Sequence, residues 1–231
     1  KDMAVITRVG KPVAFKILRI GEEEGEPVAY LSRRAAQSDC AGAFFRTLSP
    51  GDLLPAKVTH LETYGAFVDI GCGLSSLLSI DCISVSRISH PRDRLSVGMN
   101  LAVAVKSVDT ELYRIFVTLK ELLGTWEENA VRFEAGQTVT GRVRSIEPYG
   151  IFVELAPNLA GLAELRNNAG QPVRTAVGDL AAVYIKSILP ERMKVKLVIV
   201  DSAASPEFPE VPKYFIDTKV TEHITYWKYS P

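Results

Sequence analysis

Several features that would narrow the function of this protein are missing from its sequence. Cysteine is scarce: there are three residues, an odd number without Cys-x-x-Cys spacing, which argues against a disulfide framework and a zinc knuckle. Three free thiols suit a reducing compartment, so we expect a cytoplasmic protein. No apolar run reaches about 18 residues, and the chain opens Lys1-Asp2-Met3 without the apolar stretch of a secretory signal. We therefore expect no membrane span and no membrane partner.

An excess of charge of either sign is also missing. The 27 basic and 27 acidic residues give a net charge of zero, whereas a protein that binds a polyanion normally carries a basic surplus. Any nucleic-acid binding must therefore depend on local patches of charge and on stacking by aromatic side chains. We expect its affinity to be modest.

Motifs for catalysis are absent as well. The sequence has no Gly-x-x-x-x-Gly-Lys-Ser/Thr loop, no His-Glu-x-x-His zinc motif and no Gly-x-Ser-x-Gly nucleophile turn. The carboxylate run Glu22-Glu23-Glu24 is interpreted as a solvated turn rather than a metal site. The sequence therefore predicts a protein that is not an enzyme and that uses no metal, no cofactor and no small-molecule substrate.

The sequence does contain an internal repeat. Tyr64-Gly65-Ala66-Phe67-Val68 recurs 85 positions later (149 − 64) as Tyr149-Gly150-Ile151-Phe152-Val153. The same offset superimposes further glycines and apolar residues, including Gly51 on Gly136 and Leu77 on Leu162. From residue 98 onward the offset is 80, because the second copy has a connection that is five residues shorter (85 − 80). Self-similarity at a fixed offset indicates repeated structural units.

The amino-terminal residues 1–34 align with the second half of this unit only. Val9–Ile17 is similar to Val97–Val105, and Val28–Arg34 is similar to Ile115–Glu121. We interpret residues 1–34 as the last two strands of a module whose first half is missing. This interpretation favours a fragment of a longer array.

Each complete copy is predicted to contain five short strands. In the first copy they are Leu53–Leu61, Ala66–Ile70, Ser76–Ser79, Leu101–Val108 and Ile115–Leu119. Five strands and one long connection in about 70 residues suit a small closed barrel of the OB type. The predicted fold class is all-β: tandem five-stranded OB-type barrels with short connecting helices, plus a partial amino-terminal module.

Alternation along the second predicted strand separates an inner from an outer face. In the first copy it places Val68 and Ile70 inside the barrel and Phe67 and Asp69 outside. The corresponding residues of the second copy are predicted to be Val153 and Leu155 inside, and Phe152 and Glu154 outside.

Apolar residues at helical spacing predict connecting helices over Arg33–Leu48 and Leu119–Phe133. Prolines 206, 209 and 212 mark an extended linker, and the aromatic tail after it is expected to pack on the second barrel or on the partial amino-terminal module. The predicted division is residues 1–48 for the half-module and its helix, 49–124 for the first barrel, 125–133 for a helical linker, 134–202 for the second barrel, and 203–231 for the linker and tail.

Several segments of the first copy resemble the RNA-binding module of ribosomal protein S1. They are Gly51–Val58, Tyr64–Gly71, Ser76–Leu78, Val97-Gly98 and Val117–Lys120. The similarity covers residues 49–123 well, 134–201 moderately, and 1–34 as a half-module. The resemblance implies an OB-type barrel that binds RNA across the face of its second and third strands. It also implies a contact set of two aromatics beside a glycine, a histidine on the third strand, and an acid and a base near the last hairpin.

Carried onto the first module, the resemblance implies RNA contacts from Tyr64, Phe67, Asp109 and Arg114, with Ser79 at the histidine position. Apart from the family, a solvent-facing ring is a platform for an unpaired base, worth roughly 1–3 kcal/mol. The alternative is that one ring of the pair covers the barrel core. Lys57 is a further candidate for phosphate contact.

In the second module the candidate rings are Tyr149 and Phe152. Glu164 occupies the histidine position, where its carboxylate would repel phosphates. Leu189 replaces the acid of the last hairpin. The candidate basic residues form a predicted cationic edge of Arg142, Arg144 and Lys194.

Three other residues receive structural interpretations. We expect His60 to face outward as an ordinary surface histidine. Arg92 and Arg94 lie in the long connection between strands and are interpreted as part of a solvated loop rather than a phosphate site.

The sequence thus predicts non-catalytic binding of single-stranded RNA, such as mRNA or rRNA, with weak sequence preference and in translation, with the ribosome as a possible partner. The alternative is that the modules have lost their RNA contacts and dock a partner protein or the ribosome. Modules of this kind also occur on RNA-processing enzymes, but no residue here supplies that chemistry. An oligosaccharide ligand is a remote third reading that rests on the barrel alone.

Overall fold

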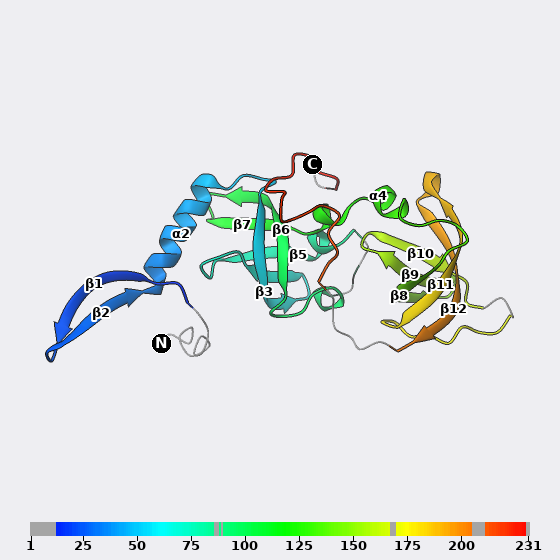
Figure 1. The fold of residues 1–231 in the computed structure, drawn as a ribbon, viewed down its shortest axis with the longest axis horizontal. Coiled ribbons are helices and arrows are strands. Elements are labelled where there is room, and N and C mark those ends of the chain that lie inside the picture. The colour runs from blue at the N-terminus through cyan, green and yellow to red at the C-terminus, as the bar shows by residue number, and fades with distance from the viewer. Residues whose placement is uncertain (1–12, 86–87, 89, 167–169, 205–210, 230–231) are drawn as a thin grey trace.

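The computed structural model describes residues 13–85, 88, 90–166, 170–204 and 211–229. An amino-terminal hairpin and helix are followed by two closed five-stranded barrels arranged in a row (Figure 1). The predicted class of tandem barrels with short helices is confirmed. Within the described residues, no helix combines the length and the apolar character needed to cross a membrane.

The first barrel closes in the order β3-β4-β5-β7-β6. Its strands are β3 (Leu53–Glu62), β4 (Gly65–Asp69), β5 (Ser75–Ser79), β6 (Asn100–Asp109) and β7 (Arg114–Thr118). Each lies within one residue of its predicted bounds. The alternation also holds, because Val68 and Ile70 are buried in the core while Phe67 and Asp69 are partly exposed. The connection between β5 and β6 contains α3 (Ile80–Ile83) and the 3₁₀ turn η1 (Pro91–Asp93).

The second barrel repeats this topology and closes in the order β10-β12-β11-β8-β9. Its strands are β8 (Thr138–Glu147), β9 (Gly150–Ala156), β10 (Leu159–Ala163), β11 (Leu180–Leu189) and β12 (Lys194–Ala203), with η3 (Pro190–Arg192) between the last two. The β-bulge between Val58 and His60 of the first barrel recurs 85 residues later between Val143 and Ser145. The sequence repeat is therefore also a repeat of local backbone irregularities.

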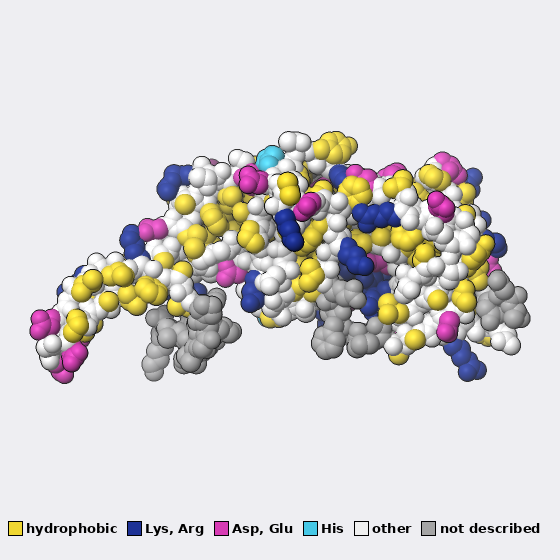
Figure 2. All heavy atoms as spheres, viewed as in Figure 1, with side chains coloured by type: hydrophobic (Ala, Val, Ile, Leu, Met, Phe, Trp, Pro, Cys, Tyr) yellow, Lys and Arg dark blue, Asp and Glu magenta, His cyan; other side chains and the backbone are white. Residues whose placement is uncertain are grey.

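The amino-terminal hairpin consists of β1 (Lys16–Glu23) and β2 (Glu26–Ser32). Its bulge between Ile17 and Arg19 aligns with the bulges of β6 and β11, as expected for the last two strands of a module. The hairpin does not close into a barrel, and its apolar side chains lie exposed along it (Figure 2). Helix α2 (Arg33–Thr47) follows as predicted, with the Ser32 hydroxyl accepting a hydrogen bond from the Ala35 amide at 3.1 Å.

The predicted helix over Leu119–Phe133 is wrong as a single element. The structure has a 3₁₀ turn, η2 (Lys120–Leu123), and a separate short helix, α4 (Trp126–Ala130). Gly124 between them adopts φ 79°, a left-handed conformation that no helix continues through. Thr125 then begins α4 with a capping box to Glu128.

The carboxy-terminal tail was expected on the second barrel or on the amino-terminal hairpin. Its described residues 211–229 bind mainly to the first barrel instead, although Tyr229 also forms a hydrogen bond with Asn158 of the second barrel. On the first barrel, β3 pairs with β6 from Leu53 onward but with β4 only from Lys57 onward, so the other edge of its first residues is open to the tail. The Leu53 amide donates to the Glu222 carbonyl, and the Ile224 amide donates to the Gly51 carbonyl, both at 2.9 Å. A side-chain hydrogen bond of 2.8 Å between the His223 ring and the Asp52 carboxylate accompanies this pairing. The tail is therefore held by strand-like addition to β3.

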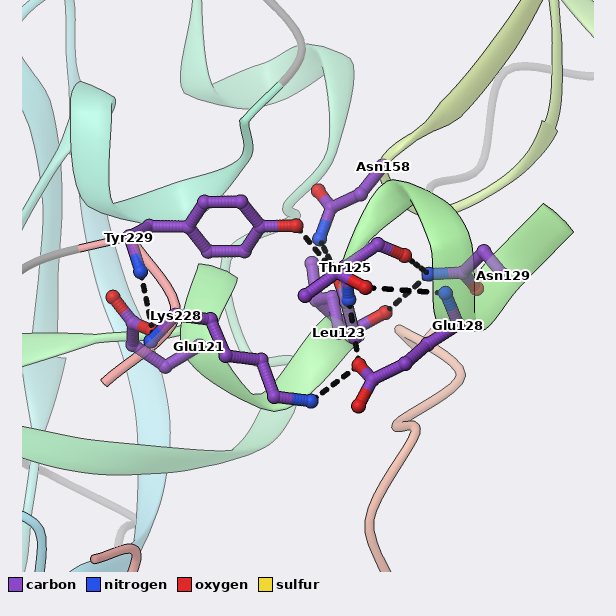
Figure 3. Close-up of polar contacts among 9 residues, drawn as sticks. Glu121, Leu123, Thr125, Glu128, Asn129, Asn158, Lys228 and Tyr229 are labelled. Atoms are coloured by element: carbon purple, nitrogen blue, oxygen red, sulfur yellow. Dashed lines mark hydrogen bonds and ion pairs between the residues drawn. The ribbon is translucent and has the colours of Figure 1, made fainter. Parts of the chain in front are cut away.

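The end of the tail also binds the linker between the barrels (Figure 3). The buried Glu121 carboxylate accepts hydrogen bonds from the backbone amides of Lys228 and Tyr229, at 2.7 and 3.1 Å. The Tyr229 hydroxyl donates to the Gly124 carbonyl at 2.9 Å, and burial together with the nearby Glu121 raises the pKa of Tyr229 to about 12. The tail thus joins the start of the first barrel to the linker that leads to the second.

Candidate nucleic-acid interface

An aromatic pair lies on the outer surface of the first barrel. Tyr64 occupies the turn between β3 and β4, and Phe67 lies on β4 between the buried Ala66 and Val68. The Tyr64 side chain is 54% exposed, and the two ring centroids are 6.3 Å apart with perpendicular planes. Because the rings meet edge to face, two bases that stacked on them would lie at a steep angle to each other.

His60 adds a third ring to this pair. It is the cross-strand partner of Phe67, and the two rings are stacked with centroids 6.5 Å apart. The bulge after Val58 turns His60 to the outer face, since residues two apart in a regular strand share a face. The His60 Nε2 atom lies 2.7 Å from the Glu62 carboxylate. The sequence analysis expected the outward direction of His60 but not its contact with Phe67, which depends on the register of two strands.

Asp109 and Arg114 lie opposite each other at the ends of β6 and β7. The Asp109 carboxylate accepts hydrogen bonds from the Glu111 and Leu112 amides at 3.0 and 2.8 Å, so it stabilises the hairpin turn. Arg114 is exposed, as is Lys57 on β3. Neither basic side chain forms a hydrogen bond or ion pair with another described residue. Both are therefore available to phosphates.

Ser79, at the position where the family has histidine, forms a hydrogen bond with Asp81 that holds the pKa of the Asp81 carboxyl below its usual range. Lys106 lies close by and donates to the Cys82 sulfur at 3.3 Å. That hydrogen bond, together with the Asp81 charge, raises the pKa of Lys106. Sequence reasoning missed this group, because its members come from three separate elements.

The second barrel presents the equivalent aromatic pair. Tyr149 is 68% exposed, and its ring lies 6.1 Å from that of Phe152 at a nearly perpendicular angle. Lys194 is exposed and has no side-chain partner among the described residues. Glu164 is exposed and forms a long ion pair of 3.6 Å with Lys186.

The two arginines of the predicted cationic edge are both bound by protein groups. Arg142 donates to the Gly178 carbonyl at 2.7 Å. Arg144 donates to the Glu154 carboxylate through Nε at 2.8 Å and through Nη2 at 3.3 Å. Their charge is therefore less available to RNA than that of Lys194.

Glu154 holds the two barrels together. It lies outside its own barrel, as the alternation predicted, but its side chain is only 9% exposed because Arg94 of the first barrel covers it and pairs with it. The solvated-loop interpretation of Arg94 is therefore wrong, since the connection that carries it packs on β9. Arg144 completes the group by donating to the Asp93 carbonyl at 3.2 Å.

Asn158 of the second barrel makes a further bridge between the modules. Its amide oxygen accepts from the Val85 amide at 3.3 Å. Its amide nitrogen donates to the Gly124 carbonyl at 2.7 Å (Figure 3). Val85 follows α3 of the first barrel, and Gly124 lies in the linker. The second barrel is thus tied to both.

Across the described part of the chain, no cluster of three or more His, Cys, Asp or Glu residues is arranged to hold a metal ion. What the fold presents is a pair of OB-type barrels, each with an outward aromatic pair and at least one exposed basic residue. The class defined by this fold and site is a tandem β-barrel binding protein.

Comparison with known proteins identifies the family. The S1 RNA binding domain matches residues 47–120. Small ribosomal subunit protein bS1 of Staphylococcus haemolyticus is 32% identical over 200 residues, and bS1 of Mycobacterium tuberculosis strain H37Rv is 31% identical over 199 residues. Each alignment covers 82% of this chain, with 50% and 41% of the respective relatives. The chain belongs to the S1 RNA-binding domain proteins and is a distant homologue of ribosomal protein bS1.

The chain thus spans about half the length, or less, of the curated relatives it matches. Among solved structures, a multidomain protein with nucleic acid binding domains from Streptococcus pneumoniae is 18% identical, with a TM-score of 0.30. That likeness covers 67% of this chain and 54% of the other.

Proposed function

We propose that this protein binds single-stranded RNA without catalysing a reaction on it. The observation that carries the proposal is the outward pair Tyr64 and Phe67 on the first barrel. The strand register places Lys57 and Arg114 on the same face. Unpaired bases stack on the rings, and the basic side chains meet phosphates. Both kinds of contact read little base identity, so sequence preference is weak.

The second barrel extends the RNA track through Tyr149, Phe152 and Lys194. Its contribution is smaller, because Arg142 and Arg144 are bound to protein groups. Two modules held in contact add avidity when their faces engage the same strand.

The homology to bS1 supports a place in translation and in the cytoplasm. The RNA partner is then mRNA or rRNA, and the ribosome is the assembly on which the protein acts. Residues 49–124 and 134–202 are the proposed modules, since each range holds the five strands of one closed barrel, except that β12 extends one residue further, to Ala203.

Tyr64→Ala should weaken binding of a fluorescent oligouridylate by about 5- to 150-fold, the loss of one stacked base at roughly 1–3 kcal/mol. Fluorescence anisotropy at low salt measures the dissociation constant, and a salt titration should show affinity falling with salt. Tyr226→Ala is the matched control, since Tyr226 is also exposed, at 73%, but lies in the tail. Absence of binding by the folded wild-type protein at low salt contradicts the proposal.

The charges on the outer face of the second barrel favour a second function for it, the docking of a partner. Its outer face carries the exposed Glu164, Arg144 already serves the contact between the barrels, and Arg142 is bound to the Gly178 carbonyl. A surface of this kind suits a partner protein or the ribosome better than a polyanion.

Tyr149→Ala decides between these two roles of the second barrel. If it binds RNA, the substitution should weaken oligouridylate binding by at least about 5-fold, the lower limit for one stacked base. The same anisotropy titration measures it, with Tyr64→Ala as the reference. A change below 2-fold for Tyr149→Ala, alongside a large change for Tyr64→Ala, assigns RNA binding to the first barrel and docking to the second.

A further inference from the structure

A row of apolar side chains crosses the outer surface of the first barrel beyond the aromatic pair. Phe67 on β4 lies opposite Leu77 on β5, and Leu77 lies opposite Phe116 on β7. All three are partly exposed. None belongs to the hydrophobic core of the barrel or to the partly buried side chains that pack against it. The core therefore does not explain why these positions are apolar.

The register also fixes where Phe116 lies on the proposed RNA face. Neighbouring strands are about 4.8 Å apart, and only β5 lies between β4 and β7, so Phe116 and Phe67 are two strand spacings apart, or about 10 Å. Arg114 precedes Phe116 by two residues on the same strand and therefore points to the same side, about 7 Å away. Phe116 thus lies between the stacking rings and the phosphate-binding arginine.

We propose that Phe116 is a third base-stacking position, so that the RNA track runs from Tyr64 and Phe67 over Leu77 to Phe116 and ends at Arg114. This inference rests on the proposed RNA binding and adds to it the length and direction of the track. A strand that touches both the rings and Arg114 must cross Phe116, and every base has a face that can stack on a ring. Leu77 lies between Phe67 and Phe116 and provides an apolar surface there.

The second barrel differs at the equivalent position. Leu162 on β10 lies opposite Lys196 on β12, and Lys196 follows Phe116 by the repeat offset of 80 residues. Lys196 is exposed and offers a phosphate contact in place of a ring. The row of the first barrel therefore ends in a ring on which a base can stack, whereas the row of the second barrel ends in the charged side chain of Lys196.

The test is a length series of oligouridylates bound to the full chain and to Phe116→Ala. The expected result is a loss of about 5- to 150-fold for oligonucleotides long enough to reach β7, and no loss for a dinucleotide held at Tyr64 and Phe67. A merely structural role would weaken all lengths alike. Where Phe116→Ala fails to fold, Phe116→Leu keeps an apolar side chain without the ring and should show the same dependence on length.

Two further variants sharpen the result. Phe116→Trp should retain affinity, and its added fluorescence should be quenched by RNA. Phe116→Lys copies the second barrel and should steepen the salt dependence by about 0.7, the slope of one additional phosphate on a single strand.

The outcomes separate this inference from the proposed function. If Tyr64→Ala weakens binding while Phe116→Ala and Phe116→Leu change it by less than 2-fold at every length, the third position is overturned and RNA binding stands. If Tyr64→Ala also has no effect, both are overturned.

Discussion

Glu154→Ala is expected to destabilise the contact between the barrels by about 3–5 kcal/mol. Glu154 is the only acidic side chain paired with Arg94 and Arg144 in the described structure, and Arg94 is 12% exposed. Removing the carboxylate leaves the Arg94 charge nearly buried without a partner, which is more costly than losing a surface pair. The remaining bridge through Asn158 consists of neutral hydrogen bonds, each worth about 1 kcal/mol.

Urea unfolding should report this loss, and small-angle X-ray scattering should show a broader distribution of distances between the barrels. Glu164→Ala is the control, because its ion pair is exposed (70% for Glu164) and contributes roughly 0–1 kcal/mol. Equal midpoints for the two variants, with unchanged scattering, would contradict the role given to Glu154. Since the group fixes one barrel against the other, loss of the contact should also reduce the avidity of RNA binding.

Gly51→Ala is expected to release the carboxy-terminal tail from the first barrel. Gly51 adopts φ 104°, and a Cβ there would lie 2.5 Å from the Ile224 carbonyl oxygen and 2.7 Å from the His223 ring. The backbone strain costs about 1–3 kcal/mol, and the backbone clash must displace the tail in addition. Displacement also breaks the backbone hydrogen bonds from Leu53 to Glu222 and from Ile224 to Gly51.

The repeat supplies a matched control for this variant. Gly136 is the equivalent residue of the second barrel, with φ 94° and no atom within 4 Å of its Cβ position. Gly136→Ala therefore carries the strain without the clash. Hydrogen exchange followed by mass spectrometry should show lost protection over residues 211–229 in Gly51→Ala alone. Equal protection in both variants would show that the tail is held elsewhere.

The strands and their faces could be predicted because they depend on residues close together in the sequence. Alternation around Val68 and the recurrence of Tyr-Gly-x-Phe-Val predict strand bounds to within one residue in the first barrel. The same logic places Phe67 and Phe152 outside. It failed at Leu119–Phe133, where apolar spacing predicted one helix and Gly124 divides it.

The candidate site could be predicted only in part. Tyr64, Phe67, Tyr149 and Phe152 form the expected pairs, but the angle between their rings follows from the packing of the barrel surface. The pairing of Arg144 with Glu154 could not be predicted from the sequence. The same carboxylate also binds Arg94, which lies 60 residues from Glu154. A sequence pattern does not show which outward-facing charged side chain, such as that of Glu154, the neighbouring module will cover.

By itself, the sequence determined the all-β class, the two modules and the outward aromatic pairs, because hydrophobic alternation and turn glycines act between neighbouring residues. Only the tertiary structure decided how the barrels join, where the tail binds and that Phe116 continues the row begun by Phe67. These features depend on strand register and on contacts between residues as far apart as Asp52 and His223, 171 positions along the chain. Such contacts exist only after the barrels have closed, when the path of the whole chain selects which surface groups meet.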